Sequence, residues 1–180
     1  DSENFAAFSF NSSLPLKKSG KNTNSYFTPK ASLRISPNKS SNLTDLDRRI
    51  DFNNIFSLNR VAGNDTIEGG QSLTVGSEYI LKKKNNYEIL SLNLATNFKD
   101  VNDENLPTKS QLGNKTSDIV GELEVNPNEY INFNYNFSLD SNLETSNYNL
   151  AKSTITINNF VTSFEFLEEN NELGSDSYLT

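Results

Sequence analysis

The sequence contains no cysteine and no histidine. Without cysteine, disulfides and thiolate metal sites are excluded; without histidine, the commonest general base and the commonest transition-metal ligand are missing. Long hydrophobic runs are also lacking, because none approaches the roughly 20 apolar residues that a membrane-spanning helix needs. A transmembrane β-strand needs only about 9–11 residues with every second one apolar, and this requirement is compatible with the composition.

Positive charge is scarce, with 16 Lys and Arg against 23 Asp and Glu, giving a net charge of −7. No basic stripe is present to neutralise phosphates, so we do not expect nucleic acid as a partner. The 180 residues have the length of one ordinary domain, and the chain begins with Asp1 and shows no signal peptide. Because the final SDSYLT resembles the start of another strand, we interpret residues 1–180 as a partial domain of a longer protein.

An alternation of apolar and polar side chains with a period of two is abundant. In INFNYNFSLD (131–140) every second residue is apolar without exception. Successive side chains of a strand point to opposite faces, so this segment has one apolar and one polar face. The pattern recurs in about eight segments, near 6–16, 27–35, 73–81, 90–98, 119–125, 131–139, 151–157 and 160–166. No convincing amphipathic helix accompanies them, so the sequence predicts an all-β fold.

The connections between these segments alternate in length. Short connections contain residues that suit tight hairpins, and they fall at 17–24, 82–86, 126–129 and 158–159. Long connections cover 37–71, 99–117, 140–147 and the tail from about 168. Short turns at one end and long loops at the other are typical of outer-membrane barrels. The sequence therefore predicts an antiparallel up-and-down meander of about eight strands.

The polar faces of these strands carry charged and amide side chains, among them Lys30, Arg34, Glu78, Glu122, Glu124, Lys152 and Glu165. A closed eight-stranded barrel is only wide enough for side chains to fill, and unpartnered charges there are costly. We therefore interpret the chain as an arc of a large transmembrane β-barrel with a wet lumen. The side chains predicted to face lipid are Leu90, Leu92, Leu94, Phe98, Ile131, Phe133, Tyr135, Phe137, Leu139, Phe164 and Phe166.

Two stretches have features that generic barrel chemistry does not demand. IFSLNRVAGNDTIEGGQSLTVGSEY (55–79) combines Asn-Arg, Gly, Asp and Gly-Gly at a fixed spacing, and SDIVGELEVNPNEYINFNYNFSLD (117–140) joins a Ser-Asp…Val-Gly strand to a Pro-containing turn. Both resemble the LPS-assembly family LptD, also called OstA or Imp. The matching positions of the first stretch are Phe56, Asn59, Arg60, Gly63, Asp65, Glu68, Gly69, Gly70 and Gly76. The chain departs from the family pattern at Val61 and Ala62, where Phe-Ser is usual, and at Thr66, where Arg is common.

The resemblance implies a bacterial outer-membrane barrel that receives lipopolysaccharide from a periplasmic bridge and releases it into the outer leaflet through a lateral gate. It also implies an LptE-type plug lipoprotein in the lumen and outer-membrane lipid around the barrel. The periplasmic bridge proteins would contact other parts of the protein. This segment would lie in the middle to later part of the barrel, away from the gate.

The first stretch also has a physical interpretation. Gly63, Gly69 and Gly70 permit tight folding, and Arg60 can pair with Asp65 or Glu68. Such a pair would close a compact loop that folds into the mouth of the lumen. We hypothesise a structural or gating role for this loop, the alternative being a plain solvated loop.

Candidate chemistry is weak elsewhere. DVNDEN (100–105) lacks the Gly and the final Glu of a calcium loop, because Asn105 and Gln111 occupy those positions, so we expect an acidic solvated loop. We expect no catalytic residue, cofactor or metal, and a transport component that is not an enzyme. Two alternatives remain open: a general porin or receptor barrel, and a soluble extracellular β-sheet adhesin or carbohydrate-binding domain. Porins have no reason to carry the motif of residues 55–79.

Overall fold

The computed structural model describes residues 6–60, 66–171 and 174–179. Strands make up nearly all of the regular structure: β1 (Phe8–Ser13), β2 (Leu16–Ser19), β3 (Thr23–Ser36), β4 (Gly70–Lys83), β5 (Glu88–Lys99), β6 (Ile119–Asn128), β7 (Ile131–Leu139), β8 (Ser146–Ile157), β9 (Phe160–Asn171) and β10 (Gly174–Leu179). A short 3₁₀ helix, η1 (Lys109–Gln111), lies between β5 and β6. Among these described residues, no helix is long and apolar enough to cross a membrane.

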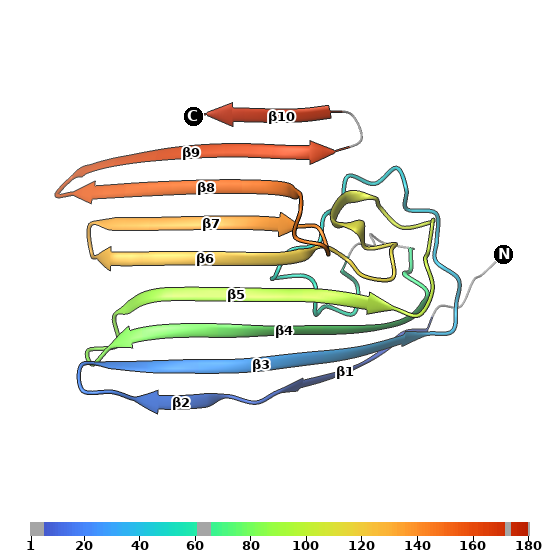
Figure 1. Cartoon of the computed structure of the whole chain (residues 1–180), viewed down its shortest axis with the longest axis horizontal. Coiled ribbons are helices and arrows are strands. Elements are labelled where there is room, and N and C mark those ends of the chain that lie inside the picture. Colours follow the sequence, from blue (N-terminus) through green and yellow to red (C-terminus); the bar gives the residue numbers. More distant parts are fainter. Residues whose placement is uncertain (1–5, 61–65, 172–173, 180) are drawn as a thin grey trace.

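The strands form one antiparallel sheet in the order β1-β3-β4-β5-β6-β7-β8-β9-β10, and β2 pairs with β3 beyond the end of β1 (Figure 1). Each strand from β3 onward lies beside its neighbour in the sequence, as in an up-and-down meander. The predicted all-β antiparallel fold is confirmed. The open sheet is consistent with an arc of a β-barrel.

The strand count differs from the predicted one at the amino-terminal end, where a single predicted segment is two strands. β1 and β2 keep the same register on β3, since Phe10 lies opposite Leu33 and Leu16 lies opposite Phe27. Between them, Leu14 N–H donates to the carbonyl of Pro29 at 3.1 Å. Pro29 has no N–H to donate back, and neither has Pro15, so the ladder is interrupted without a change of face.

The prediction of a long loop from about residue 168 is wrong. β9 continues to Asn171, and β10 begins at Gly174 and pairs with it. Glu168, Glu169 and Asn170 look like loop residues because they are polar. Their side chains have partners from elsewhere in the chain: Glu168 accepts from Asn149 and Glu169 from Arg49.

Four hairpin turns of the described chain lie at one end of the sheet, which we call the turn end (Figure 1). The long loops lie at the other, the loop end, where β9 also meets β10. The turns at 20–22, 84–87, 129–130 and 158–159 match the predicted short connections within a few residues. Asn86 and Asn158 have φ of 66° and 53°, which Asn tolerates better than most residues. Residues 37–69, 100–118 and 140–145 form the connections at the loop end.

The sheet has two chemically different faces. The outer face carries large apolar side chains that are well exposed, such as Phe10 at 68%, Phe27 at 43% and Phe164 at 52%. The opposite, inner face carries Ser32, Arg34, Thr74 and Asn97 near the loop end, and these are buried. The main apolar core lies over this inner face, between it and the long loops, and consists of Leu43, Ile50, Phe52, Ile55, Ala95, Leu106, Leu112 and Val120, with Phe56 packed against it.

Candidate functional site

Two long loops fold over the inner face and together form what we call the cap: residues 37–60 with 66–69, and residues 100–118. They are joined to each other, since Leu43 N–H donates to the carbonyl of Asn105 at 2.7 Å and Ser40 hydrogen-bonds to Asp103. Their apolar side chains pack on Ala95 of β5 and Val120 of β6. The cap therefore covers the loop end of the inner face.

Phe56 anchors the first loop to β4. Its ring lies against Gly76, where an added Cβ would stand 2.9 Å from the ring and 2.5 Å from the carbonyl oxygen of Leu94. The ring also meets Phe52 edge-to-face, with centroids 5.8 Å apart, and the Lys30 ammonium lies 5.7 Å from the Phe56 centroid. Glycine at position 76 thus provides the space that lets an aromatic side chain dock on the sheet.

Arg60 is the centre of a buried polar network. Its Nε donates to Glu68 Oε2 at 2.8 Å and its Nη2 to Glu68 Oε1 at 2.6 Å, so the pair is bidentate. The remaining N–H groups reach the sheet, where Nη1 donates to Asn97 Oδ1 at 2.8 Å and Nη2 to Ser72 Oγ at 2.9 Å. One guanidinium therefore closes the loop on itself and fastens it to β4 and β5.

Glu68 is surrounded by cations. Lys99 Nζ lies 2.9 Å from its Oε1, and Arg34 donates to its backbone carbonyl. Burial alone would raise the pKa of Glu68, but the hydrogen bonds from Arg60 and the charges of Arg60, Lys99 and Arg34 outweigh it and lower the pKa from 4.5 to about 2. The carboxylate is ionised at neutral pH and balances part of the buried positive charge.

The structure accounts for most positions of the predicted motif. It brings Arg60 and Glu68 together, whereas Gly63 and Asp65 lie outside the described residues. The side chain of Asn59 is exposed and has an interaction of its own. Gly69 passes so close to residues 38–40 that a Cβ there would be 2.3 Å from the carbonyl oxygen of Asn38. Gly70 has φ of +77°, a conformation that favours glycine.

Sequence reasoning did not identify several members of the network, including Thr74, Asn97 and Lys99. Thr74 and Asn97 lie opposite each other on β4 and β5, and Ser72 lies opposite Lys99. All four are buried polar residues at the loop end of strands that flank the two longest connections. Polar residues at inward-facing positions of a strand, next to a long loop, are the sequence signal that could have identified them.

The second motif stretch contributes a second buried carboxylate. Asp118 Oδ2 accepts hydrogen bonds from Ser138 Oγ at 2.7 Å and Asn147 Nδ2 at 2.9 Å, joining the start of β6 to β7 and β8. Its Oδ1 is buried and has no partner. Burial raises the pKa of Asp118, against the opposing effect of these two hydrogen bonds. Three residues on, Gly121 lies under the ring of Phe137 on the outer face.

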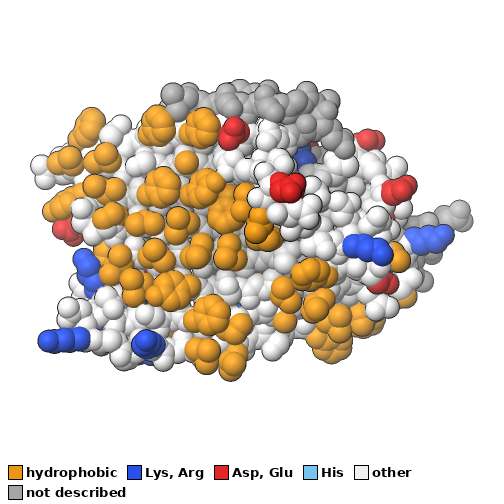
Figure 2. All heavy atoms as spheres, viewed as in Figure 1, with side chains coloured by type: hydrophobic (Ala, Val, Ile, Leu, Met, Phe, Trp, Pro, Cys, Tyr) orange, Lys and Arg blue, Asp and Glu red, His pale blue; other side chains and the backbone are white. Residues whose placement is uncertain are grey.

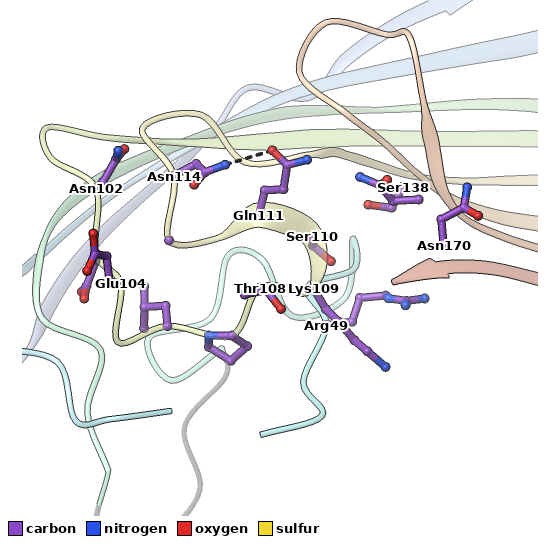
Figure 3. A pocket seen from close by; sticks show the side chains of 15 residues that line it. Arg49, Asn102, Glu104, Thr108, Lys109, Ser110, Gln111, Asn114, Ser138 and Asn170 are labelled. Atoms are coloured by element: carbon purple, nitrogen blue, oxygen red, sulfur yellow. Dashed lines mark hydrogen bonds between the residues drawn. The ribbon is translucent and has the colours of Figure 1, made fainter. Parts of the chain in front are cut away.

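A cavity of about 650 Å³ lies where the cap meets the loop ends of β7, β8 and β9. Figure 3 shows Arg49 and Lys109 on the cap side and Ser138 and Asn170 on the strand side. Lys109 Nζ lies 3.0 Å from Glu169 Oε1, and Arg49 pairs with the same oxygen. The Arg49 guanidinium also lies over the Tyr148 ring, 3.8 Å from its centroid.

The acidic stretch 100–105 is largely exposed, in line with a solvated loop. Asp103 is the exception, because it is half-buried and bonded to Ser40. Its carboxylate also accepts from the backbone N–H of Asn105 at 3.2 Å. Asp103 thus serves to hold the two cap loops together.

The inner face beyond the cap is lined by amides and carboxylates that are half-buried. Glu124 Oε1 accepts from Asn132 Nδ2 at 2.9 Å and from Asn126 Nδ2 at 3.0 Å. Asn134 donates through Nδ2 to Glu122 Oε1 at 3.2 Å and accepts through Oδ1 from Asn136 Nδ2 at 2.6 Å. This ladder across β6 and β7 satisfies its own side chains and still presents polar atoms to water.

The side chains predicted to face lipid share the outer face. Cross-strand pairs place Leu90 beside Val125, Leu92 beside Leu123, and Tyr135 beside Ala151. The other predicted positions follow the same alternation: Leu94, Phe98, Ile131, Phe133, Phe137, Leu139, Phe164 and Phe166. None of these is buried under another element of the described chain. Figure 2 shows the resulting apolar surface over the strands.

Comparison with known proteins gives one finding on identity. No curated protein matches the chain. A family model described as LptD: LPS transport system D matches residues 2–179. The chain belongs to the LptD family, whose members are LPS transport proteins of the Gram-negative outer membrane.

Proposed function

We propose that residues 1–180 form an arc of the transmembrane barrel of the outer-membrane LPS-assembly translocon, which inserts lipopolysaccharide into the outer leaflet. The observation that carries the proposal is the two-faced sheet of an LptD-family chain: exposed Leu, Phe and Ile on one side, amides and charges on the other. Exposed apolar faces of this size are unfavourable in water and favourable against acyl chains. Leu90, Leu92 and Phe133 would then contact lipid.

The inner face is polar and would line the lumen of the barrel. The sugars of an amphipathic lipopolysaccharide need a hydrated path. The side chains of Asn132, Asn134 and Glu124 offer hydrogen bonds on a surface that is not hydrophobic. The same uncovered region is available to a plug lipoprotein of the LptE type. Periplasmic bridge proteins would contact parts of the protein outside this chain.

The cap would restrict the outward-facing mouth of the barrel. Its motif residues Arg60, Glu68 and Gly76 hold a folded loop on the inner face, where it fills space that would otherwise be open to solvent. This supports the structural or gating role hypothesised for the motif. Gly63 and Asp65 would belong to the same loop.

A pair of adjacent substitutions tests the lipid contact. Leu92 and Asn93 are neighbours near the middle of β5 and point to opposite faces. In the intact protein, Leu92→Arg places a cation toward the acyl chains and costs about 2–4 kcal/mol of barrel stability. Asn93→Arg places the same cation between Glu78 and Glu122 on the inner face and is tolerated.

The readouts are folding into lipid vesicles and delivery of lipopolysaccharide to the cell surface when each variant is the only copy. We expect Leu92→Arg to reduce both and Asn93→Arg to leave both near the wild-type level. If Leu92→Arg were tolerated as well as Asn93→Arg, the outer face would be in water and a soluble adhesin-like domain would be the better interpretation.

A further inference from the structure

The cap is attached to the sheet in different ways on its two sides. Its two loops are covalently rooted on β3, β4, β5 and β6, and on this side its contacts are buried. The side chains of Arg60 and Glu68 are each only 1% exposed. Phe56 docks on Gly76 nearby. We call this side of the cap the anchored margin.

The opposite side, which we call the free margin, reaches β8 and β9, to which the cap has no direct chain connection. Here Arg49 stacks on the Tyr148 ring of β8, and Arg49 and Lys109 from the cap share the carboxylate of Glu169 on β9 in an ion triplet. Lys109 also pairs with Asp47 within the cap. The side chains of Arg49, Lys109 and Glu169 are 18%, 24% and 20% exposed. Ion pairs reached by water are screened by salt and contribute far less than buried ones.

The cavity described above runs along this free margin. Most of its lining is amide or hydroxyl, with Leu106 and Pro107 as the apolar exceptions. The main apolar core lies elsewhere under the cap, so separating the free margin from β8 and β9 forfeits less hydrophobic burial than opening the anchored margin. The anchored margin is the reverse, because opening it would expose the apolar core and unpaired buried charges.

We propose that Arg49, Lys109 and Glu169 form a salt-sensitive latch, and that the cap opens along β8 and β9 while its anchored margin stays in place. Glu169 is the shared element of the latch, since it accepts both cations. This inference concerns the motion of the cap and goes beyond the proposed function, because it holds whether or not lipid passes the opened margin.

The test uses Glu169→Gln in the intact protein, with Glu165→Gln as the matched control. Glu165 lies on the same strand and face but pairs with Lys152 of β8 and not with the cap. Amide hydrogen exchange is followed at two sets of sites. Leu46 and Gln111 donate backbone hydrogen bonds within the two cap loops that bear the latch cations, and Ile67 and Gly69 donate to serines beside the anchored margin.

We expect Glu169→Gln to accelerate exchange about threefold to tenfold at Leu46 and Gln111, with no change at Ile67 and Gly69. Raising salt from about 0.05 M to about 1 M should accelerate the same two amides in the wild type and have little further effect in Glu169→Gln. Lys109→Gln leaves the Arg49–Glu169 pair in place and should accelerate exchange less than Glu169→Gln does. This second variant keeps the proposal testable if Glu169→Gln fails to fold.

Three outcomes would overturn the proposal. Exchange at Leu46 and Gln111 could be the same in Glu169→Gln and the wild type. It could rise equally at both margins, which would mean that the cap unfolds as a whole. Glu165→Gln could have the same effect as Glu169→Gln, which would assign the change to charge on β9 and not to the latch.

Discussion

Asn97 on β5 and Asn134 on β7 both point to the inner face of the sheet, yet their surroundings differ completely. Asn97 is fully buried and accepts a hydrogen bond from Arg60, whereas Asn134 is half-buried and bonds to Glu122 in a ladder open to water. The strands are alike in pattern, and what differs is the cap above one of them. A polar inner face thus serves as a dry anchoring surface in one region and as a wetted wall in the other.

The energetic consequence follows from burial. Under the cap, Arg60, Lys99 and Arg34 surround one carboxylate, and removing one partner leaves buried charge without compensation. On the open inner face, water replaces a lost partner at little cost. Equivalent substitutions should therefore have very different effects in the two regions.

The largest effect is expected from Arg60→Ala. It leaves Glu68 and Lys99 in the dry network and removes four further hydrogen bonds of the guanidinium, so the cap should lose about 3–5 kcal/mol of stability. The matched change on the open inner face, Lys152→Ala, breaks a half-exposed pair with Glu165 and should cost about 1 kcal/mol or less. Hydrogen exchange of the cap and outer-membrane permeability to a bulky antibiotic measure the difference. Unchanged barrel assembly and permeability in Arg60→Ala would contradict the role given to the motif.

Acid should loosen the cap selectively. The pKa of Glu68 in the folded protein, about 2, is below its ordinary value of 4.5, so its ionised form stabilises the fold fully above about pH 4.5. That contribution, about 3 kcal/mol, is lost as the pH falls from about 4.5 toward 2. Exchange rates of cap amides measured across this range should rise in the wild type. In Glu68→Gln the rates should already be high, with this dependence on pH removed.

The smallest effect is expected from Asp118→Asn, which concerns the other buried carboxylate. Burial raises the pKa of Asp118, so the ionised group opposes folding, opposite in sign to Glu68. Asparagine keeps an oxygen to accept from Ser138 and Asn147 and removes the charge from the unpartnered Oδ1. Thermal stability should be unchanged or higher by up to about 1 kcal/mol. A loss as large as that of Glu68→Gln would show that the charge of Asp118 is compensated.

Much of the sheet could be predicted from the sequence because a period of two records directly which side chains share a face. The alternation in 131–139 placed Ile131, Phe133 and Phe137 on one face, and the pairing register agrees. Glu68 was one of the two partners expected for Arg60, because few acidic residues lie close to Arg60 in this glycine-rich loop. Both inferences rest on local information.

The remainder depended on contacts between distant parts of the chain. Asn97 and Lys99 are ordinary inward residues until residues 37–69 fold over them, and nothing in their own segment indicates burial. Glu168 and Glu169 were assigned to a loop for the same reason, because Asn149 and Arg49 are remote in sequence. The sequence around a polar residue does not show whether its side chain will form hydrogen bonds with water or with an arginine from a distant part of the chain.

The position of the cap loops also bears on the order in which the sheet assembles. The β4–β5, β6–β7 and β8–β9 hairpins join residues close in sequence, whereas β3 reaches β4 only after residues 37–69 and β5 reaches β6 only after 100–118. Closing a longer loop costs more chain entropy and slows the pairing it permits. These three compact hairpins, and the β2–β3 hairpin with its turn at 20–22, should therefore form early. The β3–β4 and β5–β6 pairings should form late, and the Arg60–Glu68 pair shortens the longer of the two loops that must close.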